Sequence, residues 1–149
     1  MIGLDTSILV AHAIAEHPHH EASHRWLDEM LLRNQSFAIT SGILAEFIHV
    51  VTDARRFENP LEVSQALERA AFWAEAREVT LLSANDEANA LWLKWLADFH
   101  LGRKRLLDTL IAVTWHVAGI REICTLNPRD FNIFGVFQMH GIGMEKPDA

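Results

Sequence analysis

Three acidic residues lie in apolar stretches of this 149-residue chain, where a folded protein ordinarily buries hydrocarbon. Asp5 follows Met-Ile-Gly-Leu, Glu46 stands between Ile-Leu-Ala and Phe-Ile, and Asp108 lies between Leu-Leu and Thr-Leu-Ile-Ala-Val. An isolated buried carboxylate is costly, so it normally takes up a proton, pairs with a cation or binds a metal. The three residues together predict a divalent-metal site.

The hydrophobic pattern predicts short strands that alternate with helices along the chain. We expect strands at about 2–5, 37–40, 79–82, 122–125 and 136–139. We expect helices at about 6–16, 21–33, 62–77, 84–99 and 106–118, and one more, capped by Ser41, that carries Glu46. This alternation favours an α/β fold, a three-layer α/β/α sandwich with a central, mainly parallel sheet of four or five strands.

The predicted fold brings the three carboxylates to one edge of the sheet. In open parallel sheets the functional crevice lies beyond the carboxyl ends of the strands, where Asp5 and Thr125 fall. Glu46 and Asp108, each near the start of its helix, can lean over the same edge. Close like charges raise each other's pKa values, and a hard cation such as Mg²⁺ or Mn²⁺ removes that repulsion.

Composition favours one compact domain over 1–141, followed by a flexible tail over 142–149. Half of the residues are hydrophobic, and Cys124 is the only cysteine, so no disulfide can form within the chain. The sequence has no signal-peptide pattern and no apolar run of about 20 residues. These features predict a cytoplasmic protein that has no contact with a membrane.

The charge balance argues against a protein that binds nucleic acid over its whole surface. Thirteen basic and 20 acidic residues give a net charge of −7, whereas affinity for phosphate is mostly electrostatic. Two local exceptions are Arg55-Arg56 and the run Arg103, Lys104, Arg105 just before Asp108. Such a run either follows an RNA backbone or forms a solvated helix start, and the sequence favours neither.

Four motifs in order resemble the PIN domain, and most closely the VapC-type toxins. They are Ile-Gly-Leu-Asp-Thr-Ser, a mid-chain Glu, Leu-Leu-Asp-Thr-Leu-Ile-Ala, and Thr-Leu-Asn-Pro-Arg-Asp-Phe. The resemblance covers nearly the whole chain and implies a PIN-like sandwich that cleaves RNA with Mg²⁺, for which Mn²⁺ can substitute. It also implies a homodimer and a cognate antitoxin.

The resemblance carries over to individual residues at the first three acidic positions of the family. Asp5, Glu46 and Asp108 match these positions, and Thr6 matches the hydroxyl residue that follows the first. In the implied reaction, water activated by the metal attacks the phosphodiester phosphorus. Asp5 and Asp108 hold the metal, while Glu46 binds the metal, holds a water or acts as a base.

The fourth family position is where this sequence departs from the simplest pattern. The residue two places after Thr125, a supporting residue at the strand end, is Asn127 rather than Asp. Either Asp130 supplies the missing charge, or Asn127 orients a water through its amide.

Other interpretations of the same acids stay open. Asp5 could cap a helix, Glu46 could pair with an arginine, and Asp108 could face solvent. A PIN-like domain without catalysis, serving as a module that binds RNA or protein, is the main alternative, and Asn127 favours it. A phosphatase or receiver domain with Asp5 as phosphoacceptor is weaker, because no second Asp follows two residues on.

A histidine-rich segment is the remaining group of potential metal ligands, with His20 and His24 one helical turn apart. Its members are His17, His19, His20 and His24. The segment lacks a Cys pair and a His-Glu-x-x-His pattern, which favours solvated side chains over a zinc site.

Overall fold

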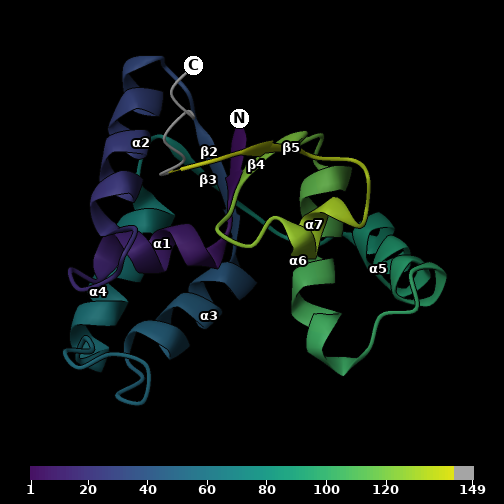
Figure 1. The fold of residues 1–149 in the computed structure, drawn as a ribbon. Coiled ribbons are helices and arrows are strands. Elements are labelled where there is room, and N and C mark those ends of the chain that lie inside the picture. The colour runs from purple at the N-terminus through teal and green to yellow at the C-terminus, as the bar shows by residue number, and fades with distance from the viewer. Residues whose placement is uncertain (143–149) are drawn as a thin grey trace, which may run out of the picture.

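A five-stranded parallel sheet forms the centre of the protein, in the order β3-β2-β1-β4-β5 (Figure 1). The computed structural model describes residues 1–142, and residues 143–149 lie outside that description. The predicted parallel sheet is confirmed. Its strands are β1 (Ile2–Leu4), β2 (Phe37–Thr40), β3 (Val79–Leu82), β4 (Glu122–Cys124) and β5 (Gln138–His140).

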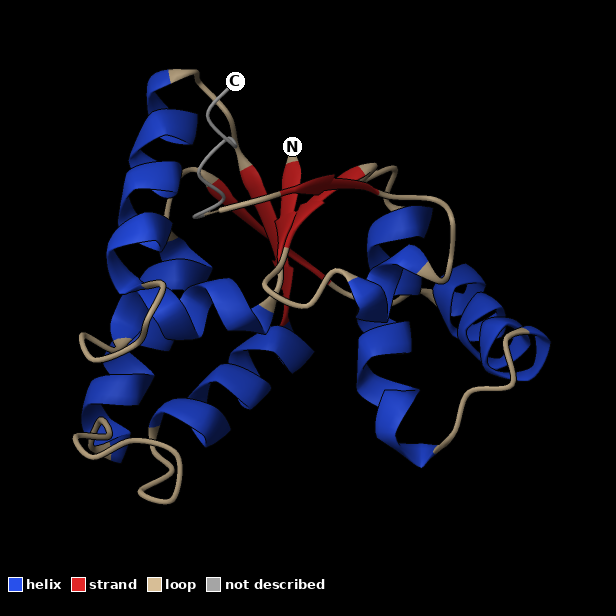
Figure 2. Ribbon diagram, in the orientation of Figure 1, coloured by secondary structure: helices blue, strands red, loops and turns tan. Residues whose placement is uncertain are grey.

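Helices cover both faces of this sheet, which confirms the predicted three-layer sandwich (Figure 2). One side carries α1 (Thr6–Ala13), α2 (His20–Leu32), α3 (Ser41–Val51) and α4 (Val63–Glu75). The other side carries α5 (Asp86–Asp98), α6 (Leu106–Val117) and α7 (Arg129–Asn132), and the short 3-10 turn η1 (Arg103–Arg105) leads into α6.

The structure corrects three local expectations. Helix α1 ends at Ala13 rather than about residue 16, because Ile14 adopts an extended backbone with φ −97° and ψ 110°. The cap of α3 is Thr40 rather than Ser41, since the Thr40 hydroxyl accepts a hydrogen bond of 3.2 Å from the Ile43 amide. The sequence pattern did not predict η1 and α7, which are too short to show a helical period.

The end of the chain that the structure describes is packed rather than exposed. Ile142 is buried against the hydrophobic core. Apart from this residue, the predicted tail over 142–149 lies outside the described residues. No helix within residues 1–142 is long and apolar enough to cross a membrane.

Close packing between Trp115 and Gly3 fixes α6 against the middle of the sheet. The Trp115 side chain is fully buried, and its Nε1 donates to the carbonyl oxygen of Ala38 in β2, at 3.1 Å. Gly3 in β1 lies so near the indole that an added Cβ would stand 2.7 Å from Trp115 Cε2. Because Gly3 lies two residues before Asp5, this contact sets the position of α6 relative to Asp5.

We expect Gly3→Ala to lower the free energy of unfolding by about 1–3 kcal/mol, because the new methyl overlaps an indole that has no room to move. Denaturant unfolding measures this loss. Gly102→Ala is the matched control, since an added Cβ there meets no atom within 4 Å. Equal stability of the two variants would contradict the tight packing of Trp115 on β1.

Candidate functional site

An open cleft of about 670 Å³ lies beyond the carboxyl ends of β1 and β4. The structure brings the side chains of all five predicted catalytic positions to the wall of this cleft, although they come from four separate segments. They are Asp5 after β1, Glu46 in α3, Asp108 in α6, and Asn127 and Asp130 after β4. The predicted convergence of the acids on one edge of the sheet is therefore what the structure shows.

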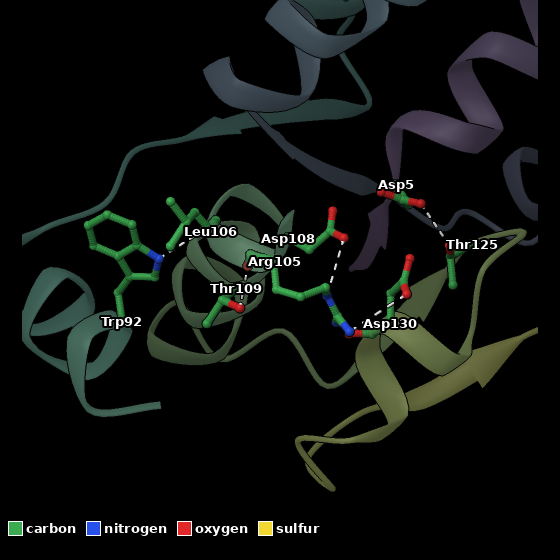
Figure 3. A network of polar contacts seen from close by, with 8 residues as sticks. All are labelled: Asp5, Trp92, Arg105, Leu106, Asp108, Thr109, Thr125 and Asp130. Atoms are coloured by element: carbon green, nitrogen blue, oxygen red, sulfur yellow. Dashed lines mark hydrogen bonds and ion pairs between the residues drawn. The ribbon is translucent and has the colours of Figure 1, made fainter. Parts of the chain in front are cut away.

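Asp5 is the deepest of the acids, with only 5% of its surface exposed. Thr125 and Ser7 both donate hydroxyl hydrogen bonds to Asp5 Oδ2, at 2.7 and 2.9 Å (Figure 3 draws the first). Asp5 stands at the cap position of α1, but its side chain makes no capping hydrogen bond. The Asp5 carboxylate lies between the ends of β1 and β4, so a helix-capping role does not explain why an acid is buried at this position.

Ser7 is a supporting residue that we did not predict. Its hydroxyl accepts a hydrogen bond of 3.0 Å from the Leu126 amide while it donates to Asp5. Thr125 plays a parallel part, because its hydroxyl accepts from the Asn127 amide at 3.0 Å. Each hydroxyl therefore joins the Asp5 carboxylate to the segment after β4. Two consecutive hydroxyl residues after an acid, Thr-Ser, were the signal in the sequence.

Burial raises the pKa of Asp5 above its ordinary value of 3.8. The hydrogen bonds from Thr125 and Ser7 favour the charged form and lower the pKa, but burial has the larger effect. The carboxylate is thus undersupplied with positive charge among the residues that the structure describes. A cation in the cleft would meet that need.

Glu46 is half-buried on α3, and its pKa is also raised. Burial is the main cause, the negative charge of Asp5 adds to it, and the hydroxyl of Thr6 opposes it. That hydroxyl lies close enough to lower the pKa of Glu46, yet it is buried and makes no hydrogen bond of standard length within residues 1–142. A buried hydroxyl favours a polar partner, and Glu46 is the acid of this cleft whose pKa the Thr6 hydroxyl lowers.

Asp108 is near the start of α6, and its pKa is raised to about 6. Burial is the largest cause, and the negative charges of Asp5, Asp130 and Glu46 all add to it, while Arg105 lowers the pKa. Each of the other three acids thus acts on Asp108. The raised pKa of Asp108 agrees with the expectation that close carboxylates repel one another at this edge of the sheet.

Two hydrogen bonds are accepted by backbone carbonyls at the start of α6, one from α5 and one from within α6 (Figure 3). Trp92 Nε1 on α5 donates to the Leu106 carbonyl oxygen at 2.9 Å, and the Thr109 hydroxyl donates to the Arg105 carbonyl oxygen at 2.6 Å. These contacts hold the helix turn from which Asp108 projects.

The three cations of the basic run have different environments. Lys104 lines the cleft, whereas Arg103 is exposed and does not line it. Arg105 forms ion pairs with Asp108 and Asp130. Arg56, which follows α3, also lines the cleft with His17 and His49, so positive and titratable groups border the acids.

The histidine segment packs on itself. His12 and His24 stack with ring centroids 3.8 Å apart, and the rings of His20 and His24 meet edge to face at 4.6 Å. His20 Nδ1 and His24 Nε2 each lie 2.9 Å from a backbone carbonyl oxygen of α1. Burial and neighbouring histidines lower the pKa of His12 to about 4. Of the four histidines of this segment, His17 alone lines the cleft.

The donor set of the cleft fits a hard divalent cation. Within residues 1–142, no three histidine, cysteine or acidic side chains stand close enough to hold an ion as they are placed. The side chains at the cleft are nevertheless oxygen donors of the kind that Mg²⁺ and Mn²⁺ prefer. Asp5, Glu46 and Asp108 have raised pKa values, and the buried Thr6 hydroxyl lines the same cleft. The carboxylates would have to close in on the ion.

Comparisons with known proteins agree with this geometry. The sequence matches the PIN domain family over residues 2–134. Ribonuclease VapC24 of Mycobacterium tuberculosis is 28% identical over 135 residues, which cover 91% of this chain and 92% of the relative.

Solved structures share the fold at lower sequence identity. VapC20 of Mycobacterium tuberculosis, a sarcin-ricin loop cleaving toxin, has a TM-score of 0.62 at 18% identity, over 83% of this chain and 87% of that chain. VapBC2 of Rickettsia felis, bound to a DNA fragment from its promoter, has a TM-score of 0.67 at 20% identity, over 95% and 99% of the two chains.

We expect Asp108→Asn to stabilise the metal-free protein at neutral pH. A carboxyl whose folded pKa is raised from 3.8 to about 6 costs stability once it is ionised. That cost appears as pH rises through this window and is fully present above it. In EDTA at about pH 8 the variant should unfold at higher temperature, with a gain of about 1 kcal/mol after discounting for the open cleft, and the difference should close by about pH 4.

Thermal melts across pH measure this effect, with Glu68→Gln as control because Glu68 is exposed on α4. Added Mg²⁺ should raise the melting temperature of the wild type and leave Asp108→Asn unchanged. A wild-type Mg²⁺ shift in the variant would contradict the assignment of Asp108 as a ligand.

Proposed function

This chain belongs to the PIN domain family, and from that membership we propose that it is a metal-dependent endoribonuclease, the toxin of a toxin-antitoxin pair. The observation that carries the proposal is the convergence of Asp5, Glu46, Asp108 and Asp130 on one open cleft. The name of VapC24, a ribonuclease related over most of both chains, supports RNA as the substrate.

Different residues of the chain have different roles in the proposed reaction. Mg²⁺, or Mn²⁺ in its place, would activate water for attack on the phosphodiester phosphorus and neutralise charge on the phosphate. Asp5, which accepts hydrogen bonds from Thr125 and Ser7, and Asp108, near the start of α6, would bind the metal. The pKa of Glu46 is raised, and its carboxyl group interacts with the hydroxyl of Thr6. We therefore assign to Glu46 the role of a group that holds a proton or accepts one during the reaction.

Asp130 is the better candidate for the fourth position. Its negative charge raises the pKa of Asp108, so it stands close enough to act at the same centre. Asn127 lines the same cleft, and the catalytically inactive binding module is the alternative that this amide favours. A fourth carboxylate three residues further along the chain supplies the charge that Asn127 lacks.

We propose two protein partners in addition to RNA: a second copy of the chain and a cognate antitoxin. The Rickettsia felis neighbour is a VapBC2 assembly, which supports an antitoxin partner. The net charge of −7 would attract a basic partner toward the acidic cleft. The same proposal assigns the protein to the cytoplasm, where its RNA substrate lies.

We expect Asp5→Asn to abolish RNA cleavage and growth arrest, because an amide binds Mg²⁺ far less well than a carboxylate. Purified proteins are incubated with total cellular RNA in Mg²⁺ or in EDTA, and growth is followed after induction. Wild type should arrest growth and cut at discrete sites in Mg²⁺ only, with activity at least about a hundredfold above Asp5→Asn.

Asp28→Asn is the matched control, because Asp28 is exposed on α2, and it should behave as wild type. Equal cutting by Asp5→Asn, or cutting in EDTA, would overturn metal-dependent catalysis. A folded wild type that neither cuts RNA nor arrests growth would instead support the binding module.

We expect Lys104→Ala and Arg56→Ala to weaken RNA binding, because these cations line the same cleft as the acids. Fluorescence anisotropy with labelled RNA measures binding in the Asp5→Asn background, where the RNA stays intact. Each substitution should lower the slope of log affinity against log salt by about one phosphate contact. Arg33→Ala is the control, because Arg33 directly follows α2 and forms an exposed ion pair with Glu29. An equal effect of this substitution would mean that RNA does not bind at the cleft.

A further inference from the structure

Arg105 stands between two acids that lie on different helices of the cleft (Figure 3). Its Nε lies 3.7 Å from Asp108 Oδ2, and its Nη1 lies 3.8 Å from Asp130 Oδ1. Within residues 1–142, Arg105 is the only partner in an ion pair with either acid. One guanidinium therefore connects the first turn of α6 to α7.

The firmest contact of this guanidinium is with the backbone. Arg105 Nη2 donates to the carbonyl oxygen of Asp130, whereas both carboxylates lie beyond ordinary hydrogen-bond length. The Arg105 Nε is buried and makes no hydrogen bond within the described part of the chain. The link to α7 can thus persist while either carboxylate turns away from the guanidinium.

The contacts of Arg105 suit a site whose carboxylates must change position to coordinate a cation. Asp108 and Asp130 are like charges that approach the same guanidinium, at 3.7 and 3.8 Å, so they repel each other. The Asp130 side chain is 40% exposed, and it lies in a four-residue helix whose buried residue, Phe131, packs against Trp115 of α6. The hydrogen bond from Arg105 adds a polar contact that fastens the backbone of Asp130 itself to the start of α6.

We propose that Arg105 is a positioning residue that fastens the Asp130 segment to α6 and so holds Asp108 and Asp130 at one divalent-cation site. This inference rests on the proposed function and gives Arg105 a role different from contact with the RNA backbone. The fork of the guanidinium matters here, because one group contacts a carbonyl oxygen and two carboxylates at once.

The test is the affinity of the metal-free protein for Mn²⁺, measured by calorimetry without RNA. Arg105→Met keeps the aliphatic stem and should weaken Mn²⁺ binding by about tenfold or more, the usual effect of losing a residue that orients a ligand. Arg105→Lys keeps the charge but not the fork, so it should fail to restore the affinity. Arg103→Met, in the same exposed turn, is the matched control and should bind as wild type.

Hydrogen exchange supplies a readout of position. In wild type the Asp130 amide donates to the Asn127 carbonyl oxygen at 3.1 Å. Amides of α7 should exchange faster in Arg105→Met, while amides of the central strands should keep their protection. Loss of protection throughout would mean a global fold defect, and Arg105→Lys then decides the proposal from its Mn²⁺ affinity.

The outcomes separate this inference from the proposed function. A wild type that does not bind Mn²⁺ would overturn the metal-dependent function itself. A wild type that binds, together with Arg105→Met that binds equally or more tightly, would overturn only the positioning role, because the guanidinium would then merely compete with the metal. Full affinity in Arg105→Lys would overturn it as well, since charge alone would suffice.

Discussion

The buried carboxylate of Asp5 is the constraint on which the rest of the site depends. A charged group at this depth costs free energy, and the hydroxyls of Thr125 and Ser7 offset part of that cost. The pKa of Asp5 stays raised in spite of these bonds. The fold thus tolerates a carboxylate that its own side chains do not fully neutralise, which is the expected condition of a ligand whose cation is external.

The remaining architecture positions other carboxylates around this fixed point. The indole of Trp115, packed on Gly3 and bonded to β2, sets where α6 lies, and α6 carries Asp108. The Thr40 hydroxyl caps α3, whose second turn carries Glu46. A rigid core is needed for this purpose, because mutually repelling acids would separate if their helices were free to shift.

Much of the fold and the main acids could be predicted from the sequence, because strand and helix periods are visible in it and parallel strand ends share one edge. The different environments of the three cations in the run 103–105 could not be predicted. Successive residues of a tight turn point in different directions, so Arg103 is exposed, Lys104 faces the cleft and Arg105 reaches the acids. The pairing of Arg105 with Asp130 depends on the short helix α7, which has no period to detect.

Two responses to the repulsion among the acids of the cleft are visible in the structure. The first is a raised affinity for protons, because the pKa values of Asp5, Glu46 and Asp108 all lie above their ordinary values. The cation of Arg105 is the second, and it acts where α6 meets α7. A divalent ion would replace both responses, since it displaces protons from the carboxyls and draws them away from the guanidinium. In the proposed function, protons, Arg105 and the metal would therefore act on the same carboxylates, and the acidic protein would gain a local positive centre in spite of its net charge.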